Sequence, residues 1–203
     1  MISSAAKRIC RFLVCTGVVS QEESELYEYG LFLLISRAAF FILVCTLGLL
    51  CDLFWECILF YLHFSLLRGY AGGVHASREW VCLLCTTLCF CLAVVGMGWL
   101  RASGTTTAAY GMLLVFGPMV WMFSPLDVPE KPLTQSEKRH YGRISKGLVL
   151  GSALIAIFAA QMGYCLLLWV IPWSVALEGL LLLAGFLKQR CCQGKQEIFR
   201  NLT

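Results

Sequence analysis

Charged side chains are scarce in this sequence. They make up 14% of its 203 residues, whereas hydrophobic residues make up 59%. A soluble domain carries roughly a quarter charged residues and needs only one apolar core. Here apolar runs recur along almost the whole chain, so the composition excludes an ordinary soluble globular domain and indicates a polytopic membrane protein.

The sequence also lacks a basic tract and a paired set of metal ligands. Its net charge is only +4, and Lys and Arg stand at the ends of apolar segments, which argues against nucleic acid as a partner. His75, Cys82, Cys85 and Cys89 do not have the close paired spacing of tetrahedral zinc sites, so we expect no metal and no cofactor. Most of the 12 cysteines lie inside apolar stretches, where we expect reduced thiols.

Apolar segments long enough to cross a membrane fill most of residues 31–187. We expect six spans: two short ones within 31–67 that turn near Asp52, then 80–100, 106–123, and two within 147–187 that break at Pro172. Trp169 and Trp173 are expected at the interface between the last two spans. A re-entrant pair that never crosses is the alternative for 31–67. The predicted fold class is all-α, a polytopic membrane helix bundle.

The remaining segments are expected to flank this bundle within a single integral membrane domain, residues 1–203. Residues 1–25 predict an interfacial amphipathic helix, because Lys7, Arg8 and Arg11 alternate with Ile9 and Phe12 at helical spacing. The order of charges and apolar residues there is not that of a cleaved signal peptide. Residues 124–146, which hold three prolines, predict a solvated loop, and residues 188–203 a tail.

Lysines and arginines predict the orientation of the bundle, because short cytoplasmic connections retain them. With six spans and both termini inside, 14 of the 16 basic residues fall in the cytoplasm. Arg101 falls outside, and Arg37 lies near the inner start of the first span. The termini, the 124–146 loop and the segment around His75 are therefore expected on the cytoplasmic side.

The segment from Arg68 to Cys82 is the most unusual in the chain, because glycines, charges and a histidine cluster between two apolar runs. If His75 precedes the helix and Ser77 caps it, His75 can fold back over Cys82. A helix N-terminus and a nearby imidazole both favour the thiolate, as in cysteine nucleophiles. The competing interpretation is that Cys82, Cys85 and Cys89 form a packing stripe on one helix face.

Other charged residues have two open interpretations each. Arg68 either holds a substrate carboxylate or extends to the membrane interface. Glu178 is either functional or a neutral hydrogen-bonded link between helices. Glu79 either orients His75 or favours the helix N-terminus. The basic loop is expected to contact anionic lipid headgroups and to guide an acidic peptide; its residues are Lys131, Lys138, Arg139, Arg143 and Lys146. His63 is expected to be buried and hydrogen-bonded, and His140 solvated.

The pattern R-x3-G-G-x-H-A-x5-C over residues 68–82 resembles the active-site segment of the accessory gene regulator B family. These are membrane cysteine endopeptidases that process a quorum-sensing propeptide. The proline- and lysine-rich segment 124–138 is similar to that family's cytoplasmic loop, and the size and six-span layout agree. The resemblance implies that His75 and Cys82 are a catalytic dyad, with Arg68 and Gly73 as active-site neighbours.

This resemblance implies cleavage of a small amphipathic propeptide at the inner face of a bacterial cell membrane. A thioester acyl-enzyme would form, and a thiol or hydroxyl of the peptide would close it to a thiolactone or lactone. The expected partners are this propeptide and membrane lipid, and the oligomeric state, including a homodimer, is left open. The alternative is a non-enzymatic transporter or permease subunit in which Glu178 and Arg68 line a path.

Overall fold

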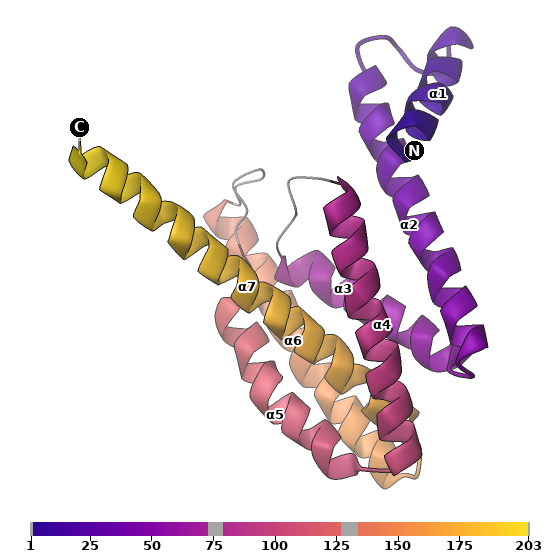
Figure 1. Ribbon diagram of the computed structural model, residues 1–203, viewed down its shortest axis with the longest axis vertical. Coiled ribbons are helices and arrows are strands. Elements are labelled where there is room, and N and C mark those ends of the chain that lie inside the picture. Colours follow the sequence, from indigo (N-terminus) through magenta and orange to yellow (C-terminus); the bar gives the residue numbers. More distant parts are fainter. Residues whose placement is uncertain (1, 73–78, 127–133, 203) are drawn as a thin grey trace. The chain divides into compact units, whose positions relative to one another are not determined.

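The structure, a computed structural model, describes residues 2–72, 79–126 and 134–202. These residues form seven α-helices and no strand (Figure 1). The helices are α1 (Ile2–Cys15), α2 (Ser24–Leu50), α3 (Phe54–Ala71), α4 (Glu79–Ser103), α5 (Thr106–Phe123), α6 (Gln135–Gln161) and α7 (Leu166–Leu202). The predicted all-α fold is confirmed.

The chain divides into two compact units, residues 1–47 and 48–203. The boundary falls inside helix α2, and the prediction of a single domain stays a prediction. In the first unit, α1 packs against the start of α2. The thiol of Cys10 is buried and donates a hydrogen bond to the carbonyl oxygen of Ser24 at 3.2 Å, and Lys7 lies 3.7 Å from Glu28. Phe12 remains exposed beside basic side chains, in line with the amphipathic helix predicted there.

Five of the described helices are long and apolar enough to cross a membrane, namely α2, α4, α5, α6 and α7. The chain is therefore a multi-pass membrane protein. The predicted turn near Asp52 is confirmed, because α2 ends at Leu50 and α3 begins at Phe54. The turn predicted over 101–105 is shorter, because α4 continues to Ser103 and α5 begins at Thr106. Helix α3 carries Glu56, His63 and Arg68 and is not one of the five, so its role as a sixth span stays a prediction.

Two predicted boundaries are wrong. The loop predicted over 124–146 gives way to helix at Gln135, because Thr134 and Glu137 form a capping box that starts α6. The break predicted at Pro172 lies instead between α6 and α7, where Gly163 adopts a positive φ of 88°. Pro172 lies inside α7, which is tolerated in membrane helices because neighbouring groups satisfy the freed carbonyl.

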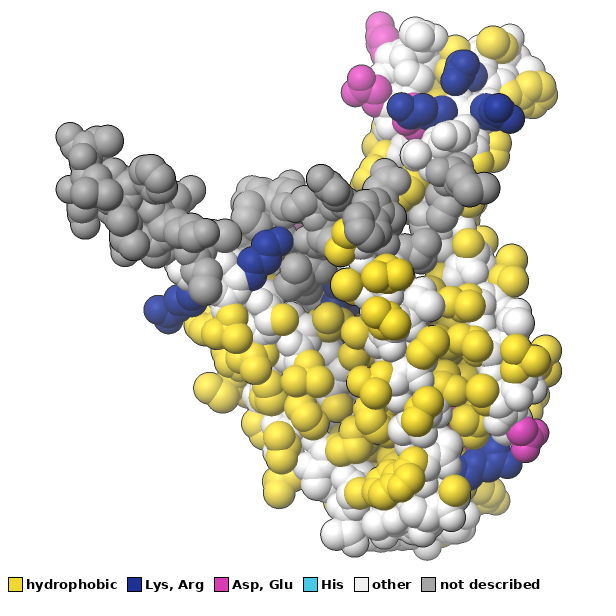
Figure 2. All heavy atoms as spheres, in the orientation of Figure 1, with side chains coloured by type: hydrophobic (Ala, Val, Ile, Leu, Met, Phe, Trp, Pro, Cys, Tyr) yellow, Lys and Arg dark blue, Asp and Glu magenta, His cyan; other side chains and the backbone are white. Residues whose placement is uncertain are grey.

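Helix α7 is the centre of the second unit, since it packs against α3, α4, α5 and α6. Leu168, Val175 and Leu182 on α7 are fully buried. Trp169 and Trp173 pack against this core within one helix, so their predicted position between two spans is wrong. Many large hydrophobic side chains are exposed on the outer surface, and among the coloured side chains of this face the hydrophobic ones far outnumber the charged ones (Figure 2), as expected where lipid is the solvent.

Candidate functional site

The expected dyad lies where the chain passes from α3 to α4. His75 and Gly73 belong to residues 73–78, and Lys131 to 127–133, so all three lie outside the described residues. For Glu79 and Cys82 the structure describes the backbone, which forms the first turn of α4. Among the described residues Cys82 is therefore the fourth residue of α4.

The segment with His75 starts beside the proline-rich loop. Leu126 donates its backbone N–H to the carbonyl oxygen of Ala71 at 2.9 Å, and Gly72 and Leu126 form an isolated parallel bridge. Gly72 has a φ of +80°, and a Cβ there would lie 2.7 Å from the oxygen of Leu126. Only glycine fits this position without strain. Gly72 after α3 and Leu126 after α5 therefore lie side by side.

The same loop is fixed to the start of α6. The hydroxyls of Ser124 and Ser145 are buried and hydrogen-bonded to each other, and Pro125 packs against Gly142, where a Cβ would be 3.1 Å from Cδ. Helix α6 brings basic residues to this end of the unit: Lys138, Arg139, Arg143 and Lys146. Lys146 lies over the ring of Trp121, 5.3 Å from its centroid. The start of the His75 segment thus has a basic surface nearby.

Arg68 and Glu178, predicted as supporting residues on separate grounds, form an ion pair. Nη1 of Arg68 on α3 lies 3.6 Å from Oε2 of Glu178 on α7. The Glu178 side chain is fully buried and has no hydrogen bond from the described residues, whereas a quarter of the Arg68 side chain is exposed. Removing one partner of a buried pair typically costs about 3–5 kcal/mol, because the other charge is left uncompensated. The pair therefore firmly joins the last turn of α3 to α7.

A second polar contact joins the same two helices. His63 Nδ1 is hydrogen-bonded to the hydroxyl of Ser174. The Ser174 hydroxyl also lies 2.8 Å from the carbonyl oxygen of Ile171, so its one proton goes either to that oxygen or to His63 Nδ1. The predicted hydrogen bond of His63 is confirmed, although the residue is only half-buried, and the predicted exposure of His140 is also confirmed.

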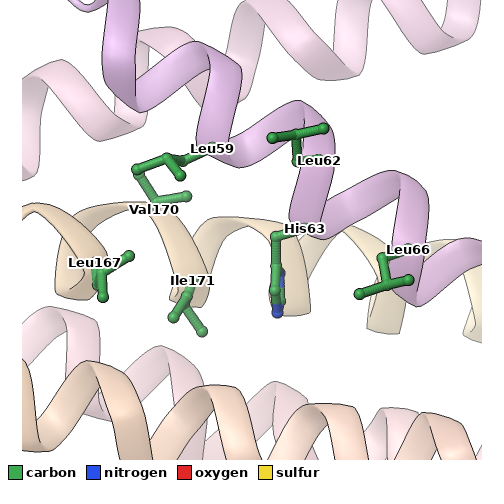
Figure 3. Close-up of a pocket in the computed structure, with 7 residues that line it drawn as sticks. All are labelled: Leu59, Leu62, His63, Leu66, Leu167, Val170 and Ile171. Atoms are coloured by element: carbon green, nitrogen blue, oxygen red, sulfur yellow. The ribbon is translucent and has the colours of Figure 1, made fainter.

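His63 also lines a groove of about 230 Å³ between α3 and α7 (Figure 3). Leucine, valine and isoleucine side chains line the rest of it. The groove offers an apolar surface without a cluster of reactive groups, so it is not a second candidate for chemistry. No group of side chains that could hold a metal occurs among the described residues.

A family model described as "Accessory gene regulator B" matches residues 6–182. The chain belongs to this family. AgrB proteins are known for propeptide processing, and membership suggests a role in agr quorum sensing. The match covers both the His75 and Cys82 segment and the α7 residue Glu178.

Curated relatives agree with this assignment. The "Putative AgrB-like protein 2" of Clostridium perfringens (strain 13 / Type A) is 28% identical over 152 residues, covering 72% of this chain and 70% of the relative. The "Putative AgrB-like protein" of Clostridium perfringens (strain SM101 / Type A) has the same identity and coverage. No solved structure matches.

Sequence reasoning missed how three pairs of residues meet. It did not pair Arg68 with Glu178, Gly72 with Leu126, or Ser124 with Ser145. The first had a usable signal, since Glu178 is the lone acid of its apolar stretch and a buried acid needs a cation. The other two are contacts between distant segments of small or neutral residues, which leave no pattern in the sequence.

Proposed function

We propose that this AgrB protein is a membrane cysteine endopeptidase that cleaves a small amphipathic propeptide on the cytoplasmic side. The observation that carries the proposal is the family match over residues 6–182, which includes His75 and Cys82. The start of α4 at Glu79 supports it, because Cys82 then belongs to a helix N-terminus.

The proposed reaction begins when His75 takes the thiol proton of Cys82 and the thiolate attacks the scissile carbonyl. His75 then gives this proton to the leaving amine, so the C-terminal fragment departs and a thioester joins the remaining peptide to Cys82. His75 then takes the proton from a thiol or hydroxyl of the same peptide, and that group attacks the thioester carbonyl. The Cys82 sulfur leaves and takes the proton back from His75, and a thiolactone or lactone ring closes.

Other residues of this end would bind the substrate. The basic start of α6, with Lys138, Arg139 and Arg143, supports binding of an acidic peptide segment and of anionic headgroups. Lys131 and Gly73 are proposed to act in the neighbouring loops, and Glu79 to favour the helix N-terminus or to orient His75. Arg68 is held in an ion pair with buried Glu178, which favours a supporting role over a free anchor for a substrate carboxylate.

The transporter alternative is less well supported. It requires Arg68 and Glu178 to line a path, whereas Glu178 is fully buried and its carboxylate faces Arg68. The groove between α3 and α7 is apolar and offers no polar route for a solute.

The test uses purified enzyme in lipid with a synthetic propeptide that has an amphipathic helix, an internal cysteine and an acidic tail. Cys82→Ala and His75→Ala should each abolish cleavage, and Cys85→Ala is the matched control, since it removes an exposed thiol one turn further along α4. The wild-type enzyme should accumulate an adduct that hydroxylamine releases. Full cleavage by Cys82→Ala would refute the mechanism.

A further inference from the structure

The position of Glu178 suggests that its charge has a function. It is fully buried in α7, within the apolar stretch 147–187 that contains no other charged residue. Ionisable side chains in a membrane segment are costly to insert and mark functional positions by default. Its carboxylate faces the guanidinium of Arg68 at 3.6 Å.

Arg68 lies directly before the segment that holds His75. It belongs to the last turn of α3, and its carbonyl oxygen accepts the backbone N–H of Gly72 at 3.1 Å. From Gly72 the chain continues into residues 73–78 and reaches α4 at Glu79. A shift of the Arg68 turn would therefore move the first residue of this segment.

We propose that Glu178 is a positioning residue for catalysis: through Arg68 it fixes the end of α3, and hence where the His75 segment starts relative to Cys82. This inference rests on the proposed function of His75 and Cys82. The ion pair suits the role because charges attract strongly in an apolar surrounding, and because its partners come from helices far apart in sequence. The hydrogen bond between His63 and Ser174 joins the same two helices about one turn before the Arg68–Glu178 pair.

The first test separates charge from shape. Glu178→Gln keeps the shape and removes the charge, whereas Glu178→Asp keeps the charge and shortens the side chain. With the synthetic propeptide, Glu178→Gln should lower kcat about 10- to 100-fold, the usual cost of misplaced catalytic groups, with KM changed less than about threefold. Glu178→Asp should retain more kcat than Glu178→Gln.

A matched control removes the charge of another buried, paired glutamate, which lies at the opposite end of α3 from Arg68. Glu56 is also buried and paired with an arginine, Arg101, at 3.3 Å, but it lies in the first turn of α3, away from Gly72. Glu56→Gln should leave kcat within about threefold of the wild type, because it does not touch the catalytic end. If Glu178→Gln fails to reach the membrane, Glu178→Met, which inserts more readily, replaces it with the same expected loss.

The second test needs no substrate. Iodoacetamide labelling of each cysteine, followed by mass spectrometry across pH, reports the thiolate of Cys82. In Glu178→Gln the half-maximal labelling of Cys82 should move to higher pH, while that of Cys10 stays unchanged. Wild-type Cys82 that labels no faster than Cys85 would contradict the proposed function itself. A reactive Cys82 with the same pH profile in Glu178→Gln, or a Glu178→Asp enzyme slower than Glu178→Gln, would overturn this inference alone.

Discussion

At the level of single residues, Arg101 holds the turn between α2 and α3. Its Nη1 donates hydrogen bonds to the carbonyl oxygen of Asp52 at 2.6 Å and to Oε1 of Glu56 at 3.3 Å, and its Nη2 lies 3.6 Å from the Asp52 carboxylate. Glu56 is buried, whereas the Asp52 side chain is almost fully exposed. The contact with Glu56 should therefore matter most, because an exposed pair contributes little.

We expect Arg101→Met to destabilise the protein by about 1–3 kcal/mol, because buried Glu56 and the Asp52 carbonyl lose a charged donor. The midpoint temperature of unfolding in detergent is the measurement. Adding Glu56→Gln should recover part of the loss, since the orphaned charge is removed. Equal destabilisation by Arg101→Met with and without Glu56→Gln would show that the two side chains are not coupled.

At the level of elements, α4 and α7 lie in close contact at Gly96. A Cβ on Gly96 would lie 1.8 Å from Cζ2 of the Trp173 ring. Gly98, two residues further along the same helix, has room, since a Cβ there would meet only Leu53 at 3.4 Å. The two glycines thus differ in packing but share the same helix.

This difference predicts opposite effects of the same substitution. Gly98→Ala should be neutral or stabilising by up to about 1 kcal/mol, because alanine favours the helix. Gly96→Ala should destabilise by about 1–3 kcal/mol, since the ring of Trp173 must move. Thermal unfolding and tryptophan fluorescence of both variants provide the test. A Gly96→Ala protein as stable as Gly98→Ala would mean that α4 and α7 do not touch there.

At the level of the whole molecule, charge separates the two ends of the second unit. Arg101 lies with Asp52 and Glu56 where α3 begins and α4 ends. The other described basic residues of this unit belong to the end where α3 and α5 finish and α6 begins, or to the last part of α7; they are Arg68, Lys138, Arg139, Arg143, Lys146, Lys188, Arg190, Lys195 and Arg200. This distribution agrees with the charge rule that predicts the second end to be cytoplasmic.

The predicted topology can be tested at Cys51 and at the C-terminus. Cys51 is exposed beside Asp52, so a membrane-impermeant maleimide should label it in intact cells. A green fluorescent protein fused after Thr203 should fluoresce, because it folds on the cytoplasmic side. Labelling of Cys51 only in permeabilised cells, or a dark fusion, would place the His75 segment outside and contradict the proposed side of cleavage.

Much of the fold follows from local sequence patterns. Apolar length predicts most of the helices, and the breaks near Asp52 and at Gly104 fall where polar residues or a glycine interrupt the apolar runs. The sequence also contains a signal for the start of α6, the capping box of Thr134 and Glu137. The prolines and charges of residues 124–146 nevertheless favoured the prediction of a loop. The break predicted at Pro172 is wrong because a membrane helix can contain a proline when neighbouring groups satisfy the freed backbone carbonyl.

The sequence by itself determined the class of protein and most of its helices, because hydropathy is a local property, and its resemblance to a family suggested His75 and Cys82 as the candidate dyad. Tertiary structure alone decided that Arg68 pairs with Glu178, that Gly72 lies against Leu126 and that α7 is the central helix. These contacts join segments far apart in the chain, and which of them form depends on how whole helices pack. A lone acidic residue in an apolar segment predicts that a cationic partner exists. Only the packing of the helices decides which basic side chain lies close enough to pair with it.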